Sequence, residues 1–282
     1  MGSLSSNDAY GGLDETPLGT ADSRLSSMQV ATKPLSPDLS VAVSGLRGES
    51  LGIVLYGSHA RGDAGPDSDV DLLQLVRDSP HSYTFDRVSV VAYTLEQIQE
   101  MTAAGSVFAW HLRTEGVIVE DLDGTLQATL SRHPGPASDR TIRRIRVLSA
   151  ILDLGPLEFE PYADRAIRTA RYLTRTALYA RALEAGGRSF NLVAAANAAG
   201  LPHLAGLLTP RRDPDGTWST FLAFRAALSE LIGPLSQNPF GSLEALAVQS
   251  WATDRQLSAL AIQTMLPREG EIAYSSLPPP LL

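Results

Sequence analysis

The stretch that decides the fold runs from Leu51 to Val76 and reads LGIVLYGSHARGDAGPDSDVDLLQLV. Its first six residues are largely apolar and too few for a helix, so they predict a buried strand. The Gly57-Ser58 pair ends that strand, and glycine is typical of places where the backbone turns sharply or approaches a ligand closely. A polar loop and a second strand follow. Asp69 and Asp71 lie two residues apart on this second strand, which predicts side chains on the same face.

Two neighbouring carboxylates repel each other, and one of them resists ionisation unless a cation joins the pair. Mg2+ is a hard cation that prefers oxygen ligands and commonly keeps substrate phosphates in its shell. Backbone N–H groups after Gly57, the Ser58 hydroxyl and the Arg61 guanidinium are suited to hold an anion nearby. Together these features predict a site for a triphosphate carried on Mg2+. The alternative is an ordinary turn followed by a solvated acidic loop.

The order and spacing of these residues resemble a known signature. Residues 57–62 (GSHARG) and 68–72 (SDVDL) are similar to the motif of the DNA polymerase β-like nucleotidyltransferase superfamily, and the resemblance covers roughly residues 38 to 125. It implies a small mixed β-sheet flanked by helices. It also implies that Asp69 and Asp71 hold the metal and carry catalysis. The residues that it assigns to nucleotide binding are Gly57, Ser58, Arg61 and Ser68.

Members of this superfamily usually carry a third carboxylate on the next strand, facing the first two. Within the strand expected over residues 85–93 (FDRVSVVAY), the position that aligns with this acid is Ser89. Serine brings no negative charge to a metal and is not a base near neutral pH. Asp86 is the nearest acid, but the two-residue period of a strand points it to the other face.

Three explanations of the serine at position 89 remain open. Another acid can supply the missing ligand, the enzyme can work with one well-held metal, or the site can bind a nucleotide without transferring it. The acids considered for the first explanation are Asp86, Glu158, Glu160 and Glu184.

The composition of the chain and its lack of long apolar runs exclude several classes of protein. The chain of 282 residues has no cysteine, which excludes disulfides, thiolate metal sites and thiol nucleophiles. No apolar run approaches the roughly 20 residues needed to span a bilayer, and no secretory signal is visible at the start. These features predict a cytoplasmic protein with no membrane partner. The formal net charge of −8 disfavours long nucleic acid as a partner.

The sequence pattern predicts two folded domains between two tails. Residues 1–35 are rich in Ser, Gly, Asp and Thr and are expected to be disordered. Residues 36–134 are the expected nucleotidyltransferase domain, which ends at the break HPGP. Residues 137–266 show helical spacing and predict an all-helical bundle of four or five helices, before a C-terminal tail at 267–282. The expected fold class is therefore α+β.

Local signals place several elements. Thr94 and Gln97 form a capping-box pattern at the start of a helix that ends near Ala104. A short helix is expected over Val107–Thr114, and a strand over Val117–Val119. The helices predicted in the second half are 162–184, 191–199, 221–232 and 243–265.

Arginines of the helix 162–184 line one stripe because their spacings are three, three and four: Arg165, Arg168, Arg171 and Arg175. One interpretation is a solvated face that pairs with local acids. The other is a cationic wall that receives nucleotide phosphates or an anionic acceptor. His59 leaves a similar choice between a phosphate contact and an exposed loop position, whereas His111 is expected to be structural.

The function that these features predict is Mg2+-dependent transfer of a nucleoside monophosphate from an NTP to an acceptor hydroxyl, with release of pyrophosphate. ATP is the favoured nucleotide, and a small molecule or a protein is the favoured acceptor. The alternative, which rests on Ser89, is a catalytically degenerate nucleotide-binding or antitoxin-like interaction protein. A homodimer is also left open.

Overall fold

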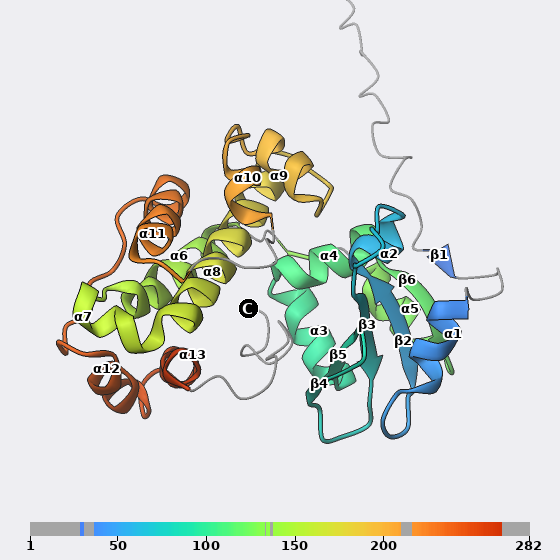
Figure 1. The fold of residues 1–282 in the computed structure, drawn as a ribbon. Coiled ribbons are helices and arrows are strands. Elements are labelled where there is room, and N and C mark those ends of the chain that lie inside the picture. The colour runs from blue at the N-terminus through green and yellow to red at the C-terminus, as the bar shows by residue number, and fades with distance from the viewer. Residues whose placement is uncertain (1–28, 31–36, 133, 136–137, 210–215, 267–282) are drawn as a thin grey trace, which may run out of the picture.

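The computed structural model describes residues 29–30, 37–132, 134–135, 138–209 and 216–266. They form a sheet domain and a helical domain that lie side by side (Figure 1). This is the α+β class expected from the sequence. The predicted tails lie outside the described residues, apart from residues 29–30. No helix in the described ranges is long and apolar enough to cross a membrane.

The described part of the first domain contains a mixed sheet. Its strands are β1 (Gln29–Val30), β2 (Gly52–Tyr56), β3 (Val70–Leu75), β4 (Ser82–Phe85), β5 (Val88–Tyr93) and β6 (Val117–Asp121). They are ordered β1-β6-β2-β3-β5-β4. β2 is antiparallel to both β3 and β6, whereas β3 is parallel to β5. The central strands are almost wholly buried, as their apolar runs predict.

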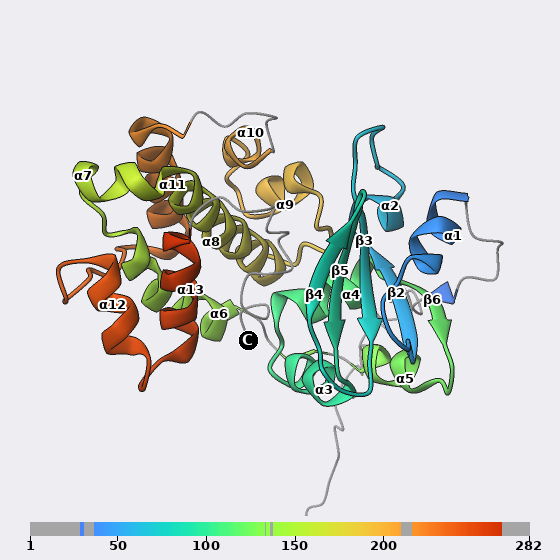
Figure 2. The same ribbon diagram turned by 60° about the horizontal axis from the view of Figure 1, so that its bottom comes forward.

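Helices cover both faces of this sheet (Figure 2). They are α1 (Pro37–Ser44), α2 (Gly57–Arg61), α3 (Leu95–Ala103), α4 (Val107–Glu115) and α5 (Thr125–Ser131). On one face, α3, α4 and α5 each insert a fully buried side chain: Ile98, Leu112 and Leu126. Burial of each such side chain contributes about 1.5–3 kcal/mol. On the other face, α1 buries Ala42. The predicted capping box of α3 is confirmed, because the Thr94 and Gln97 side chains bond each other's backbone N–H groups.

The strand predicted over residues 85–93 is confirmed from Val88 as β5, and it is the second strand of a hairpin. β4 and β5 pair antiparallel, with Asp86 and Arg87 between them. Asp86 has a φ of 47°, a conformation that Asp tolerates because its short side chain can bond locally. The first strand of the hairpin, β4, was not predicted, and only its last residue, Phe85, falls in the predicted range. The edge of β5 offers backbone partners to this segment, which the local sequence does not reveal.

Three short elements also differ from what the sequence predicts. Gln29 and Val30, expected in a disordered tail, pair in parallel with β6, whose free backbone edge accepts a short strand. Residues 57–61, expected to be a turn and loop, form one helical turn. The helix α5 was missed, although Asp121 accepts hydrogen bonds from two backbone N–H groups in its first turn.

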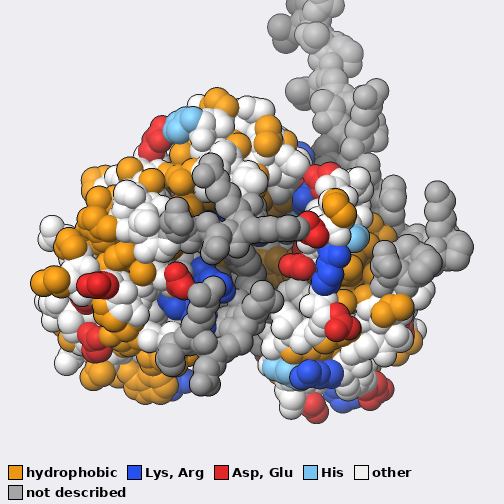
Figure 3. All heavy atoms as spheres, in the orientation of Figure 1, with side chains coloured by type: hydrophobic (Ala, Val, Ile, Leu, Met, Phe, Trp, Pro, Cys, Tyr) orange, Lys and Arg blue, Asp and Glu red, His pale blue; other side chains and the backbone are white. Residues whose placement is uncertain are grey.

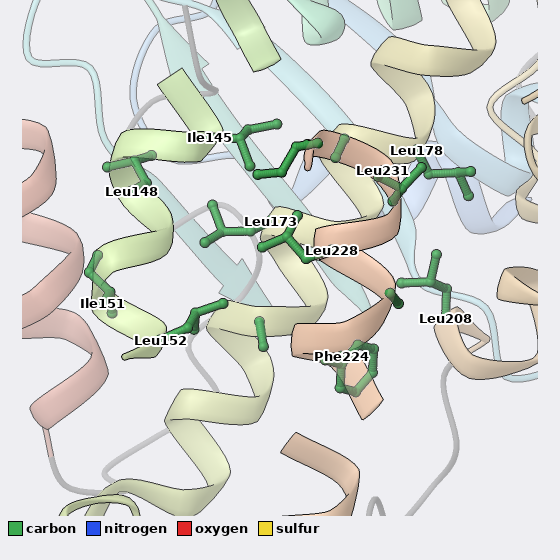
Figure 4. Close-up of a cluster of buried hydrophobic side chains, with 14 of the residues drawn as sticks. Ile145, Leu148, Ile151, Leu152, Leu173, Leu178, Leu208, Phe224, Leu228 and Leu231 are labelled. Atoms are coloured by element: carbon green, nitrogen blue, oxygen red, sulfur yellow. The ribbon is translucent and has the colours of Figure 1, made fainter. Parts of the chain in front are cut away.

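The second domain is helical throughout its described part. Its α-helices are α6 (Ser138–Leu148), α7 (Pro156–Phe159), α8 (Ala163–Glu184), α9 (Leu192–Ala198), α10 (Leu204–Leu208), α11 (Trp218–Ile232), α12 (Leu243–Ser250) and α13 (Arg255–Met265). The long helix α8 runs through the centre, as Figure 2 shows. Apolar side chains of α6, α8 and α11 meet around it, among them Ile145, Leu173 and Leu228 (Figure 4). The predicted helices 162–184, 191–199 and 221–232 are confirmed within a few residues.

The helix predicted over residues 243–265 is broken into two. The Asp254 carboxylate accepts a hydrogen bond from the Leu257 backbone N–H at 3.0 Å and so caps α13. The same carboxylate accepts hydrogen bonds from both terminal nitrogens of Arg144, each at 2.6 Å. Because Asp254 caps α13 and is held by a cation from another helix, the chain begins a new helix here and does not continue α12. The domain therefore has more and shorter helices than the four or five predicted.

Helix α4 belongs to both domains. Ala109 and Leu112 lie in the core under the sheet, whereas Val107 and Trp110 pack into the core of the helical domain. The Trp110 indole N–H donates to the Gly135 carbonyl oxygen at 3.1 Å, in the connection between the domains. One helix with two apolar faces thus couples the sheet to the bundle.

Candidate active site

Gly57 connects β2 to the single helical turn α2. Its φ is 73°, a left-handed conformation that glycine adopts without steric cost. A Cβ atom placed on Gly57 would lie 2.3 Å from Oδ2 of Asp71. Only glycine therefore leaves room for this carboxylate, and the backbone turn and Asp71 are packed against each other.

The two acids of the motif occupy different positions. Asp71 is the second residue of β3 and pairs in register with Tyr56 on β2. Asp69 immediately precedes β3 and is exposed. The prediction that both lie within the strand therefore holds for Asp71 alone. The two carboxylates still interact, because the charge of Asp69 raises the pKa of Asp71.

Asp71 lies in surroundings that disfavour its charge. Burial is the main cause that raises its pKa, to about 6, and the negative charge of Asp69 adds to it. Positive charges of Arg175, His59 and Arg61 act in the opposite direction, and among them Arg175 has the largest effect. Arg175 belongs to α8, so the helical domain reaches the edge of the sheet where the motif lies.

Ser89 lies directly beside Asp71. β3 and β5 are parallel, and their register pairs Asp71 with Ser89 and Val70 with Val88. The pairing thus agrees with the alignment that put Ser89 in the place of a third acid. Within the described residues, no group of three or more His, Asp or Glu side chains gathers in a way that could hold a metal ion.

Three of the acids considered as substitutes are engaged elsewhere or lie off the strand. Asp86 is exposed in the turn between β4 and β5. The Glu158 carboxylate accepts the Leu243 backbone N–H at 2.7 Å, at the start of α12. Glu184 pairs with Arg181 at 2.7 Å on the surface of α8. Neither of these contacts, nor the place of Asp86 in the turn, brings an acid to Asp71.

Arg61, which we expected to neutralise phosphates, is held by two carboxylates. Its Nη1 donates to Oε2 of Glu115 at 3.0 Å. Its Nε and Nη2 lie 3.2 and 3.1 Å from the carboxylate oxygens of Asp63. All three guanidinium nitrogens therefore have an acidic partner. The geometry ties Arg61 to the protein, which differs from the open cation that the motif suggests.

Glu115, at the end of α4, is a residue that sequence reasoning missed. Its side chain is only 8% exposed and lies 3.2 Å from the His111 ring nitrogen. It also accepts hydrogen bonds from the Phe190 backbone N–H at 2.7 Å and the Ser189 hydroxyl at 3.2 Å. Burial by itself would raise the pKa of Glu115, but these bonds and Arg61 outweigh it and hold the pKa below its usual range.

The segment Ser189–Asn191, between α8 and α9, is the helical domain's contact with this group. The Asn191 side-chain amide donates to the Asp63 carboxylate at 2.8 Å, while its oxygen caps α9. The Phe190 ring stacks on His111 with centroids 4.3 Å apart. Burial lowers the pKa of His111, which fits its expected structural role. Figure 3 shows acidic and basic side chains on the surface of both domains.

The remaining motif residues organise the loop. The Ser68 hydroxyl accepts the Gly65 backbone N–H at 2.8 Å, and the Ser68 carbonyl accepts a hydrogen bond from Arg87 at 2.8 Å. The Ser58 carbonyl accepts the Asp63 N–H at 3.1 Å, so Ser58 closes the short helix. His59 is half-buried, with Nε2 3.3 Å from the Ser68 carbonyl oxygen.

The site thus joins a buried strand, a glycine-dependent turn and two acids at the start of the neighbouring strand. Residues 42–119 match the model of the nucleotidyltransferase domain family. This part of the chain is therefore a nucleotidyltransferase domain, consistent with the DNA polymerase β-like superfamily. The match covers the chain from α1 into β6 and does not include the helical domain. No curated protein matches the chain in sequence.

Proposed function

We propose that the protein is a Mg2+-dependent nucleotidyltransferase that moves a nucleoside monophosphate from an NTP to an acceptor hydroxyl. The observation that carries this proposal is the packing of Asp71 against Gly57, with Asp69 beside it. An acceptor oxygen would attack the α-phosphorus, the bond to the β-phosphate bridge would break, and its electron pair would leave with pyrophosphate. The hydroxyl proton would pass to solvent water.

The residues at this edge fit a hard divalent cation. Asp69 and Asp71 supply carboxylate oxygens, the donors that Mg2+ prefers. The raised pKa of Asp71 indicates a buried carboxylate without enough positive charge around it, which a cation would relieve. When bound, Mg2+ would neutralise phosphate charge and orient the triphosphate. Asp69 and Asp71 would hold it, and the N–H groups of the glycine turn would orient the phosphates.

A second candidate function follows from Ser89. Because Ser89 is the strand neighbour of Asp71, the carboxylate set is one acid short of the superfamily pattern. Such a site can bind a nucleotide and act as a sensor or as an antitoxin-like interaction module. Ser89→Asp separates the two functions. A gain of transfer would favour a degenerate site, and a loss would favour a site that already works with serine.

The choice of nucleotide, the kind of acceptor and the location of the protein are part of the same proposal. ATP is the favoured nucleotide, and a small molecule or a protein is the favoured acceptor. Long nucleic acid is disfavoured by the net charge of −8. We propose a cytoplasmic location and leave a homodimer open.

The first test is calorimetric binding of each of the four NTPs, with and without Mg2+, to wild type and to the double variant Asp69→Asn/Asp71→Asn. We expect metal-dependent binding in wild type and its loss in the variant. This test needs no knowledge of the acceptor. If folded wild type bound no NTP, the proposed function would be wrong. Once an acceptor is known, Asp69→Ala and Asp71→Ala should each abolish transfer while the fold stays intact.

A further inference from the structure

The motif arginine is not placed to receive phosphates. Each guanidinium nitrogen of Arg61 has an acidic partner, either Glu115 or Asp63, and the side chain is only 18% exposed. To bind a phosphate, Arg61 would have to leave one of these partners. Glu115 would then be a buried acid without its cation, which is costly. Arg61 is therefore not a free cation for a triphosphate.

A series of ring contacts connects α8 of the helical domain to the edge of the sheet. The Arg175 guanidinium lies 5.8 Å from the centre of the Tyr179 ring. The Tyr179 ring is 5.0 Å from that of Phe190, which stacks on His111 at 4.3 Å. The His111 ring meets Tyr56 at 5.5 Å, and Tyr56 is the register partner of Asp71. These contacts connect this part of α8 to β2 through Phe190 and through His111 of α4.

The positive charge of Arg175 shifts the pKa values of residues on three elements of the sheet domain. It lowers the pKa of Tyr56 on β2, of Asp71 on β3 and of His111 on α4. On Asp71 its effect exceeds that of Arg61, although Arg61 belongs to the motif itself. The Arg175 guanidinium is therefore close enough to Asp71 for the two charges to interact.

The stripe to which Arg175 belongs has two parts. Arg171 lies 5.4 Å from the ring of Phe224, a core residue of α11, so this arginine is held within the helical domain. Arg168 is exposed. Arg175 lies one turn further along α8, in the part of the helix that meets the sheet domain. The interpretation as a wholly solvated face therefore does not describe Arg175, which is half-buried.

We propose that Arg175 of α8 binds the β- and γ-phosphates of the nucleotide, and that Arg61 is a positioning residue for the glycine turn. The proposal rests on the proposed nucleotide transfer and names the cation that this site would use. An arginine fork is well suited to phosphate oxygens. The triphosphate would then be held between the two domains, and the Ser189–Asn191 contacts would keep Arg175 at the right place.

The test is calorimetric binding of ATP and AMP in Mg2+ to the full-length protein and its Arg175→Gln, Arg175→Lys and Arg168→Gln variants. We expect Arg175→Gln to weaken ATP binding by about ten- to hundredfold and AMP binding little, because AMP lacks the β- and γ-phosphates. Arg175→Lys keeps the charge but loses the fork, so it should bind ATP more tightly than Arg175→Gln and more weakly than wild type. Arg168→Gln, on the same helix but exposed, should bind both nucleotides as wild type does.

Two results would overturn the inference. One is an Arg175→Gln variant that binds ATP like wild type, and the other is an equal loss of ATP and AMP affinity. If wild type shows Mg2+-dependent ATP binding that Asp69→Asn/Asp71→Asn abolishes, either result would leave the proposed function standing. Absence of any nucleotide binding by wild type would reject both. Arg61→Gln should lower the stability and weaken ATP and AMP binding to a similar degree.

Discussion

Asp71 and Glu115 are two acids of the sheet domain that lie close to the helical domain but in opposite electrostatic surroundings. Glu115 has Arg61, two hydrogen bonds from residues 189–190 and a neighbouring His111, and its pKa is lowered. The pKa of Asp71 is raised to about 6, mainly by burial and in addition by the charge of Asp69. Both carboxylates are removed from water to a large degree. Only Glu115 receives full compensation from the protein.

The difference separates a structural acid from a functional one. A buried acid with several donors stabilises the fold, because the charged form is the favoured form. A buried acid without them costs stability, and the site gains from a cation that the chain does not itself supply. The surroundings of Asp71 are thus suited to a metal-bound nucleotide, whereas those of Glu115 join the two domains.

The largest effect is expected at Glu115. Glu115→Ala removes the partner of Arg61 and leaves the Phe190 N–H without its acceptor, so the free energy of unfolding should fall by about 3–5 kcal/mol. The measurement is urea denaturation near neutral pH. The matched control is Glu184→Ala, which removes an exposed partner of Arg181 and should cost about 0–1 kcal/mol. Equal losses for both variants would contradict the structural role of Glu115.

Removing the charge of Asp71 should stabilise the fold, in contrast to the loss of Glu115. Its pKa is about 6 in the fold and near its ordinary value of 3.8 when unfolded, so the folded state binds the additional proton between these values. Its contribution to stability is therefore present below about pH 4 and is lost as the pH rises through about 6. Asp71→Asn should accordingly stabilise the metal-free protein by about 2–3 kcal/mol at pH 8 and have little effect at pH 4.

Urea denaturation of wild type and Asp71→Asn across this pH range checks the prediction. Asp69→Asn is the control, because Asp69 is exposed and should change stability less. A variant that is less stable than wild type at pH 8 would show that Asp71 is compensated after all. Mg2+ should also bind more weakly as the pH falls through about 6, since the proton competes for the carboxylate.

Gly57→Ala tests the packing between the turn and Asp71. The positive φ of 73° should cost about 1–2 kcal/mol of stability, and the new Cβ must displace the Asp71 carboxylate. Gly62→Ala is a matched control, because Gly62 has a φ of 78° but nothing within 4 Å of its added Cβ. We expect similar losses of stability, with Mg2+-dependent ATP binding lost only in Gly57→Ala. Equal binding by both variants would remove the steric argument for this site.

The smallest effect is expected at Asn191. Asn191→Ala removes the cap of α9 and the bond to Asp63, which should cost about 1 kcal/mol of stability. Thermal unfolding measures this loss. Ala194→Ser, at an exposed position of α9, is the control and should change stability by less than about 0.5 kcal/mol. A loss at Asn191 as large as that at Glu115 would mean that the capped helix dominates the contact between the domains.

Local signals predicted much of the fold. The apolar run ending at Tyr56, the capping box at Thr94 and the long helix 163–184 all depend on nearby residues, and all are found. The hairpin at Asp86 and the break at Asp254 were missed although each has a local signal, an Asp suited to a turn or a cap. The partner of Asp254, Arg144, lies 110 residues away, whereas β5 follows β4 after a turn of two residues.

The sequence by itself determined the nucleotidyltransferase motif, because its glycine, serine and two acids lie within 15 positions of the chain, from Gly57 to Asp71. Only the tertiary structure decided which charges meet. Arg61 and Glu115 are 54 residues apart, and Arg175 approaches Asp71 from another domain. No local pattern encodes such pairs, since electrostatic compensation depends on distance in space and on burial. The fold therefore determines that Glu115 is compensated and that Asp71 needs a cation.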